Sequence, residues 1–231
     1  MIRKALPGRD RSLTTREALL RAGEDLFSEH GFSGASVDQI ARRAGVNKAM
    51  ISYHFGGKAG LYGAILAATL GPVTERLQGL RDAPMSAEAR LRTYLDVFGA
   101  LHISHPALSV MVLREILSGG HHLDDRLMPH LLGLMECVRS IVDSGVKDGT
   151  FRPADPTMTH ISIVGSLVLF FATARFRNRL VREGRVAAIA PPPEEYIRHI
   201  KEFVLRGLLA PTAAPSSKAE GSGPRHAENG A

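Results

Sequence analysis

The chain has 231 residues, of which 44% are hydrophobic, and a formal net charge of +6. That length can bury a sizeable core in two modest domains. Nine phenylalanines and four tyrosines without a tryptophan favour an aliphatic helical core over a β-sandwich. The single cysteine, Cys137, excludes an internal disulfide and suits a reducing, cytoplasmic setting. It lies in an apolar helical stretch, so we expect a buried structural thiol, with redox sensing as the alternative.

The positive charge is concentrated near the N-terminus. Residues 1–58 carry ten basic and six acidic side chains, a net charge of +4, and the remainder of the chain carries only +2. A basic head on a nearly neutral body suits a polyanion, although a membrane surface would attract the same charges. The N-terminus lacks the apolar run of a signal peptide, and the apolar stretch 161–172 is too short to span a bilayer as a helix. We therefore expect no membrane partner.

The first predicted elements are an arm and a helix. Residues 1–13 are expected to form a flexible basic arm, which can lie along a DNA minor groove; a solvated tail is the alternative. Residues 15–30 predict an amphipathic helix that Gly31 ends. Its apolar face comprises Ala18, Leu19, Ala22, Leu26 and Phe27.

Residues 36–58, SVDQIARRAGVNKAMISYHFGGK, predict two short helices joined by a glycine turn. Ser36 and Gln39 have the spacing of a capping box, Gly45 can take the left-handed conformation that ends a helix, and Asn47 caps the next helix. Four residues are left on the outer face of this second helix: Lys48, Ala49, Ser52 and Tyr53. A recognition helix uses such positions to meet base edges and phosphates in the major groove. Taken alone, the same pattern also fits an ordinary helical hairpin with a solvated face.

The order of these elements, with LFSEHGFSGASVDQIARRAGVNKAMISYHF followed by GGKAGLY, resembles the DNA-binding domain of the TetR family of transcriptional regulators over residues 14–65. The resemblance implies an all-α fold. A three-helix helix-turn-helix domain would occupy residues 14–57, and a larger helical effector-binding and dimerisation domain would occupy 58–210.

The resemblance also implies DNA contacts. By it, phosphates or bases would be contacted by Ser36, Lys48, Tyr53, His54 and Lys58, and the predicted DNA-binding set is completed by Asn47, Ala49, Met50 and Ser52. Two features depart from the family pattern. Ser52 stands where the family most often has tyrosine, which puts a direct contact there in doubt. Ala59-Gly60 replaces the usual acidic pair, which weakens the capping of the helix that begins at Lys58.

The rest of the chain predicts helices separated by breakers. The first runs from Lys58 to about Leu80 with a kink or break at Gly71-Pro72. Others follow Ser86, run from Pro106 to Gly119-Gly120, and span about 124–147, 157–175 and 194–209, with Asp155 and Pro156 starting the fifth of this series. Residues 211–231 have too few apolar residues to fold and are predicted to be disordered.

Two of these helices suggest a subunit interface. The 157–175 helix is apolar nearly all round, and Gly165 and Ser166 would allow close approach of another helix. The 194–209 helix carries an apolar stripe. By the resemblance, both would pair with their copies in a four-helix interface, giving a homodimer that can read a palindromic operator. The alternative is that both helices only fill the monomer core.

An effector cavity is expected between the middle helices. The candidate lining residues are Phe98, His102, Met111, Arg114, Met135 and Phe170. Each also fits a plain core position, and Arg114-Glu115 also fits an ion-paired feature. His102 and His105 have a spacing that can hold a metal, but no carboxylate or thiolate completes a set. We therefore expect no metal and no cofactor.

These patterns favour a DNA-binding regulator over an enzyme, because the chain has no nucleophile elbow, phosphate-binding glycine loop or zinc-ligand motif. We expect its operator affinity to be lowered by an unknown small-molecule effector, and we take it as a repressor from the commoner behaviour of similar proteins. The alternative is a basic helical adaptor that binds protein or a membrane surface. Salt-dependent, sequence-selective duplex binding would separate the two.

Overall fold

The computed structural model describes residues 14–123, 125–187 and 191–211. In chain order, its helices are α1 (Thr15–Gly34), α2 (Val37–Ala44), α3 (Ala49–Phe55), α4 (Lys58–Gln78), α5 (Ala87–Ser104), α6 (Pro106–Leu117), α7 (Met128–Lys147), α8 (Pro156–Ala172), α9 (Ala174–Arg182) and α10 (Pro193–Leu208). The predicted all-α fold is confirmed. The predicted arm, 1–13, and all but the first residue of the predicted tail lie outside the described residues.

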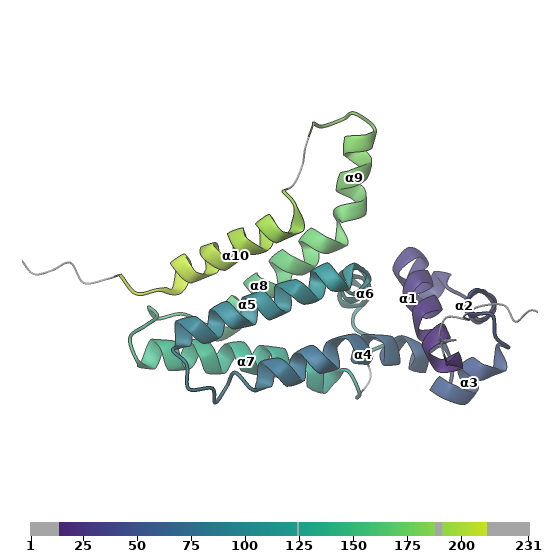
Figure 1. Ribbon diagram of the computed structural model, residues 1–231, viewed down its shortest axis with the longest axis horizontal. Coiled ribbons are helices and arrows are strands. Elements are labelled where there is room, and N and C mark those ends of the chain that lie inside the picture. The colour runs from purple at the N-terminus through teal and green to yellow at the C-terminus, as the bar shows by residue number, and fades with distance from the viewer. Residues whose placement is uncertain (1–13, 124, 188–190, 212–231) are drawn as a thin grey trace, which may run out of the picture.

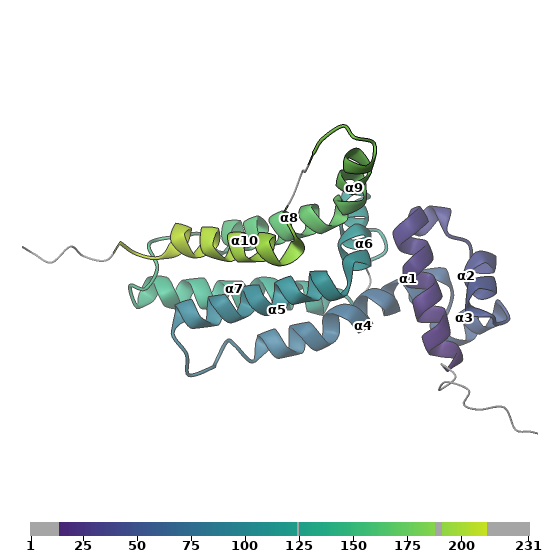
Figure 2. The same ribbon diagram turned by 45° about the horizontal axis from the view of Figure 1, so that its top comes forward.

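The molecule is elongated, with α1, α2 and α3 grouped at one end (Figure 1). Helix α4 leads from this group into a body in which α4, α5, α7, α8 and α10 run roughly lengthwise (Figure 2). Helix α6 turns away from α5 by 97° and lies where the body meets α1. No helix in the described part of the chain has, by itself, the length and apolar character needed to cross a membrane.

Local sequence signals set several helix ends. The Ser36 hydroxyl accepts a hydrogen bond from the Gln39 amide at 3.2 Å, and the Gln39 side chain accepts one from the Ser36 amide at 2.8 Å. This reciprocal pair is the predicted capping box. Gly45 ends α2 with a φ of 68°, as expected of the glycine turn. Asp155 caps α8 by accepting from the Met158 amide at 2.8 Å, with Pro156 in the first turn.

Four boundaries differ from the prediction. Helix α1 continues to Gly34, although Gly31 breaks its helical backbone with a φ of 73°. The alternative of a break at Gly71-Pro72 is wrong: α4 continues through Pro72, because Leu70, Thr74 and Leu77 are all buried and their packing holds both halves in one element. Helix α7 begins at Met128 rather than near residue 124, with a proline in its first turn. The long helix predicted over 157–175 ends at Ala172, and α9 follows with a bend of 42°.

One continuous apolar core joins the N-terminal helices to the body. Cys137 of this core is fully buried, and its thiol donates to the Leu77 carbonyl at 3.2 Å. Burial raises the pKa of this thiol to about 11, so it stays protonated and poorly nucleophilic. The expected buried thiol is confirmed, and its hydrogen bond ties α7 to α4.

Candidate nucleic-acid interface and ligand cavity

Helix α3 presents one polar face to solvent and anchors the other in the core. Ile51 and Phe55 are buried, whereas Lys48, Ala49, Ser52 and Tyr53 are exposed. Tyr53 is 80% exposed, whereas tyrosine is usually buried to an intermediate extent. A rigid helix therefore holds a cation, a hydroxyl and a phenol together on one open surface.

The start of α3 is fixed by Asn47, whose side-chain oxygen accepts from the Ala49 amide at 2.8 Å. Lys48 lies 3.3 Å from Asp38 of α2, and both side chains are more than half exposed. A surface pair of this kind contributes little to stability, so the ammonium can exchange Asp38 for another anion at small cost. Asn47 thus has a capping role, and Lys48 is available for a partner.

Met50 and His54 are less accessible than their neighbours. Met50 is half-buried and packs against the core. The His54 ring lies edge-on to Tyr53 at 5.0 Å between ring centroids, and its buried Nε2 has no partner. His54 supports the position of the Tyr53 ring more directly than it offers a surface of its own.

Lys58 points into the domain. Its Nζ donates to the Ala35 carbonyl at 2.8 Å and lies 4.4 Å from the centroid of the Phe32 ring. It thereby joins the start of α4 to the connection between α1 and α2, just before Ser36. This placement gives Lys58 a structural role, and a phosphate contact is a poorer fit to it.

The structure explains why residue 60 is a glycine. A Cβ atom there would lie 1.8 Å from the carbonyl oxygen of Phe55, so any other residue would force α4 away from the end of α3. The departure from the acidic family pattern at 59–60 therefore accompanies an unusually close approach of the two helices.

Helix α6 contacts α1 through Arg114 just before the non-helical Gly31, where the first part of α1 ends. Its guanidinium donates to the Phe27 carbonyl at 3.1 Å and to the Glu29 carbonyl at 3.4 Å. A cation at a helix C-terminus satisfies carbonyls that lack helical partners and complements the helix dipole. The next residue, Glu115, is only 2% exposed. One oxygen of its carboxylate accepts from the His122 amide at 2.6 Å, and the other lies 3.2 Å from Nδ1 of the His122 ring.

Aromatic contacts complete this junction between the N-terminal domain and the body. The His122 ring lies 3.7 Å from the Phe32 ring, measured between centroids, and the Tyr62 hydroxyl donates to the Met111 carbonyl at 3.2 Å. Burial, and then the charge of Glu115, raise the pKa of Tyr62, so its phenol remains a neutral donor. We call the contacts of Arg114, Glu115, His122, Tyr62 and Phe32 the α1–α6 junction.

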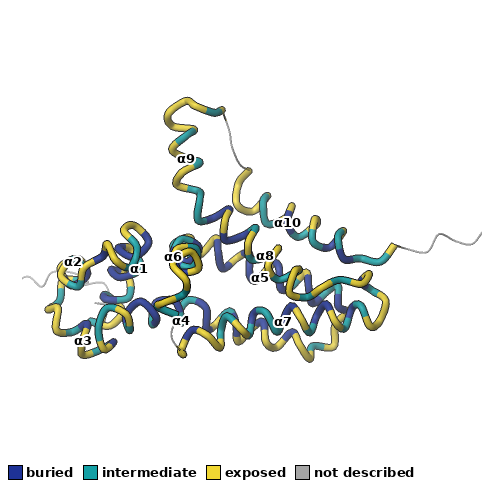
Figure 3. Tube along the Cα trace, turned by 180° about the vertical axis from the view of Figure 1, so that it is seen from behind, coloured by how far each residue is buried: buried dark blue, intermediate teal, exposed yellow. Residues whose placement is uncertain are grey.

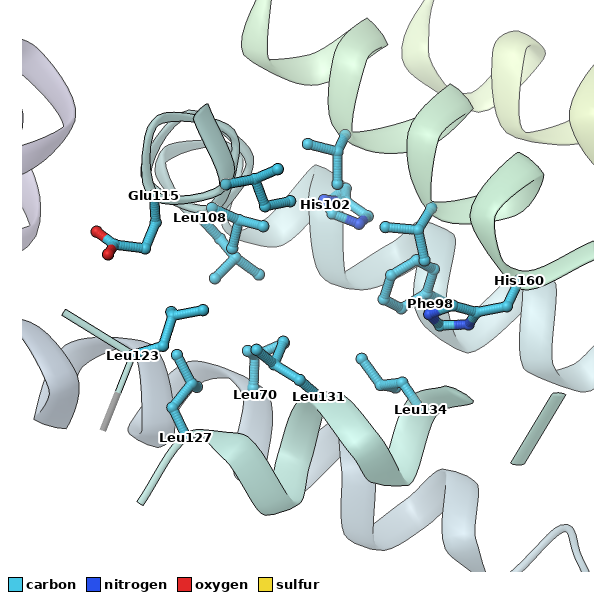
Figure 4. Close-up of a pocket in the computed structure, with 14 residues that line it drawn as sticks. Leu70, Phe98, His102, Leu108, Glu115, Leu123, Leu127, Leu131, Leu134 and His160 are labelled. Carbon is cyan, nitrogen blue, oxygen red and sulfur yellow. The ribbon is translucent and has the colours of Figure 1, made fainter. Parts of the chain in front are cut away.

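Inside the body, a cavity of about 180 Å³ adjoins this junction (Figure 4). Its walls come from α4, α5, α6, α7, α8 and the segment before α7, and they consist of Leu70, Phe98, His102, Leu108, Val112, Glu115, Ile116, Leu123, Leu127, Leu131, Leu134, His160, Val164 and Val168. Glu115 lies at the end of the cavity next to Leu123, and His160 lies at the opposite end beside Phe98.

The structure brings only two of the six effector candidates to this cavity, Phe98 and His102. Met111 is buried elsewhere in the core, and Arg114 faces α1. Met135 is half-buried outside the cavity, and Phe170 stacks on Tyr196 of α10 at 3.8 Å between ring centroids. These four residues do not line the cavity, because the apolar stripe of each helix is wider than the part that faces it.

Sequence reasoning missed the other two polar residues of the wall, His160 and Glu115. A signal for His160 existed: His160, Val164 and Val168 recur every four residues and so share one face of α8. Glu115 gave no such signal, because its buried carboxylate is partnered by His122, which follows α6 in a segment whose path the sequence did not indicate.

Both cavity histidines are held neutral. His102 is 2% exposed; its Nδ1 lies 2.7 Å from the Ser109 hydroxyl, and its Nε2 has no hydrogen-bond partner. Burial lowers the pKa of His102 to about 4 and also lowers that of His160, whose buried Nδ1 is unpartnered. Within the described ranges, no three His, Cys, Asp or Glu side chains are placed to hold a metal ion.

Comparison with known proteins agrees with this geometry. Residues 19–65 match the family described as bacterial regulatory proteins, tetR family, and residues 84–214 match the tetracyclin repressor-like C-terminal domain. The chain belongs to the TetR family. The two matched regions coincide with the helix-turn-helix end of the molecule and with the body that holds the cavity.

Three known proteins are compared with this TetR-family chain. It is 32% identical over 143 residues to the HTH-type transcriptional regulator RutR of Escherichia coli K12, a match that covers 61% of this chain and 66% of RutR, just under two thirds. It is 27% identical over 201 residues to the HTH-type transcriptional repressor NicS of Pseudomonas putida KT2440, which covers 84% of this chain and 92% of NicS.

The third is a solved structure. The transcriptional regulator FadR of Bacillus subtilis, in complex with stearoyl-CoA, matches with a TM-score of 0.66 and 17% identity, covering 82% of this chain and 97% of FadR. At that identity the likeness shows the TetR fold alone.

We predict that His102 makes folding of this TetR-family protein sensitive to acid. Its pKa is about 4 when folded and about 6.5 when unfolded, so the unfolded chain binds more protons between these values. Stability should therefore fall as pH drops through this window, by at most about 3 kcal/mol from this residue. Urea unfolding at pH 7.5 and pH 4.5 should show a smaller loss for His102→Leu than for the unchanged protein. Equal losses would show that His102 is not held neutral by burial.

Proposed function

We propose that this chain is a ligand-responsive transcriptional regulator, a repressor, that binds a DNA operator through α3 and is released when a small molecule enters the cavity. The observation that carries the proposal is the exposed face of α3, presented by a helix whose opposite face is buried. A DNA-binding helix needs this combination of rigidity and exposed polar side chains. Family membership, and the repressor name of NicS, support it.

Affinity and specificity would come from different residues. Lys48 and Tyr53 are exposed at the start and middle of α3, where an ammonium and a phenol can meet phosphates. Ser36 is exposed at the start of α2, but its hydroxyl already caps that helix. Ala49 and Ser52 are exposed and small, so base readout through them would rest on a methyl contact or a single hydroxyl.

We also propose a homodimer formed mainly through α8. Three large apolar side chains of α8, Met158, Ile161 and Leu169, are 66%, 57% and 56% exposed. Gly165 lies among them with no atom within 4 Å of where its Cβ would be, which leaves room for another helix. Most of the α10 stripe packs within the chain, with Ile200 and Leu208 buried and Phe203 exposed. Helix α10 would therefore contribute to the proposed interface mainly through Phe203 and its neighbours.

Coupling between cavity and operator would run through the α1–α6 junction. Glu115 belongs to both the cavity wall and the junction, and Arg114, beside it, holds the end of α1. A ligand that shifts α6 would alter both sets of contacts, which would reposition α1 and α4 and the α3 helix attached to them. Such a ligand acts by binding one arrangement better than the other. A cytoplasmic location accords with this role.

The adaptor alternative has less support, because its basic surface would not require the small, exposed side chains of α3. The two proposals differ in a simple measurement. A regulator binds one duplex sequence preferentially, whereas an adaptor shows no preference between an operator and random DNA. Selection of bound duplexes from a random pool would supply the operator for the experiments below.

We predict that Lys48→Ala weakens operator binding and lowers its salt dependence. Loss of one phosphate contact should reduce the slope of log affinity against log salt by about 1. Titration of the selected duplex at several salt concentrations measures both effects. Arg139→Ala is the matched control, since Arg139 is an exposed arginine of α7 that pairs with Glu136. Unchanged affinity in Lys48→Ala would contradict the assignment of α3.

We predict that Leu169→Asp dissociates the dimer, because it places a charge within the proposed apolar interface. Sedimentation equilibrium at micromolar concentration should show a monomer for the variant and a dimer for the unchanged protein. Leu117→Asp, at an apolar side chain of α6 that is 78% exposed, is the control and should remain dimeric. A monomeric unchanged protein would overturn the interface.

We predict that Arg114→Met lowers operator affinity about fivefold or more, a typical size for coupling between sites, while leaving the dimer intact. The variant loses both hydrogen bonds to α1 but keeps an apolar stem of similar length. Arg139→Met serves as its control. Operator affinity that is the same in all three proteins would show that the junction does not position the DNA-binding domain.

A further inference from the structure

The chemistry of the cavity wall restricts what it can hold. Of its fourteen lining residues, three are polar, and the others are aliphatic or phenylalanine. No lysine or arginine is among these lining residues. The guanidinium nearest in sequence belongs to Arg114, and it is directed to the carbonyls of α1 instead. An anion that entered the cavity would therefore lose its hydration without gaining a positive partner.

The charged group of the wall reinforces this restriction. Glu115 is a carboxylate with 2% exposure, and its oxygens are engaged by His122. In Figure 4 this carboxylate points away from the leucines and toward the end of the cavity beside the N-terminal domain. A ligand carboxylate would be repelled by it in a medium of low dielectric constant. A ligand cation would have to compete with His122 for the Glu115 carboxylate, which points out of the apolar part of the cavity.

The polar atoms of the wall that lack a hydrogen-bond partner are uncharged imidazole nitrogens, each with less than 1 Å² exposed. A ligand group reaches one of them only through a small shift of the ring. His102 Nε2 is buried at the wall without a partner, while Ser109 fixes the other side of the ring. A buried polar atom of this kind is costly unless a partner satisfies it. Protonation of His102 to receive an anion at neutral pH would be disfavoured about a thousandfold, because its pKa lies near 4. A neutral hydroxyl suits this nitrogen in either tautomer, since it can both donate and accept.

We propose that the cavity binds an uncharged, mainly apolar molecule whose hydroxyl group hydrogen-bonds to Nε2 of His102. The proposal rests on the proposed function for the identity of the cavity as the effector site. It names the class of effector: aliphatic or aromatic alcohols and phenols fit, and carboxylates and acyl thioesters of charged carriers do not. The remaining wall, from Leu70 to Val168, supplies the apolar surface that the body of the molecule would cover.

A series with one tail and three head groups tests this. Isothermal titration calorimetry of the full chain at pH 7.5 would compare 1-octanol, octanoate and octylammonium below their solubility limits. We expect octanol to bind at least tenfold more tightly than either ion. His102→Leu should weaken octanol binding about three- to tenfold, the range for one lost hydrogen bond. His105→Leu, at a half-buried histidine that does not line the cavity, is the control.

The outcomes are distinct. Octanoate or octylammonium binding as tightly as octanol would overturn the proposal, as would no octanol binding or equal octanol affinity in the two histidine variants. Operator affinity with and without octanol, measured separately, tests the effector role. Selective octanol binding without a change in operator affinity would support the cavity chemistry and contradict the effector role. Lack of operator binding altogether would refute the proposed function while leaving the calorimetric result to stand.

Discussion

Arg114 of α6 donates to two carbonyls of α1 that lie just before its break at Gly31, and so adds directed hydrogen bonds to the apolar core that joins the two parts of the molecule. The carbonyls just before such a break are the ones that a regular helix leaves short of partners, and here a side chain from the body donates to two of them. The next residue along α6, Glu115, contacts both the loop that packs on Phe32 and the interior cavity. Any movement of α6 therefore acts on α1 and on the cavity wall together. No other helix among the described residues carries two adjacent side chains with these two roles.

The N-terminal domain depends on a similar use of side chains to position backbone. Lys58 donates to the Ala35 carbonyl, and Asn47 accepts from the Ala49 amide at the start of α3. Two residues of the predicted DNA-binding set thus fix the geometry of their exposed neighbours. Gly60 permits α4 to approach the end of α3 closely. On the proposed DNA-binding face of α3, the exposed side chains that can reach a phosphate are therefore those of Lys48 and Tyr53. This division between supporting and exposed residues explains why the recognition surface can be rigid although α3 has only seven residues.

Sequence reasoning was strong where the signal is local and weak where it depends on packing. The capping pair Ser36 and Gln39, the turn at Gly45 and the start of α8 at Asp155 were all predictable, because each needs only neighbours within a few residues. The continuity of α4 through Pro72 was not, since burial on both sides outweighs the cost of a proline. The direction of Lys58 and Arg114 was equally inaccessible, because their partners lie 23 and 87 residues away. The cavity was expected, but only contacts in space select which residue of each apolar stripe lines it.

Helix α9 was not predicted, and its surroundings explain why. It projects from the body and buries none of its side chains, as its exposed course in Figure 3 shows. Packing of an apolar face supplies most of a helix's stability in a folded protein, and nine residues are too few to form a stable helix alone in water. Helix α9 can therefore unfold and refold while the body stays intact. Its backbone amides should exchange hydrogen with solvent far faster than those of α4 or α7, because α9 has a lower local stability against unfolding than these two helices.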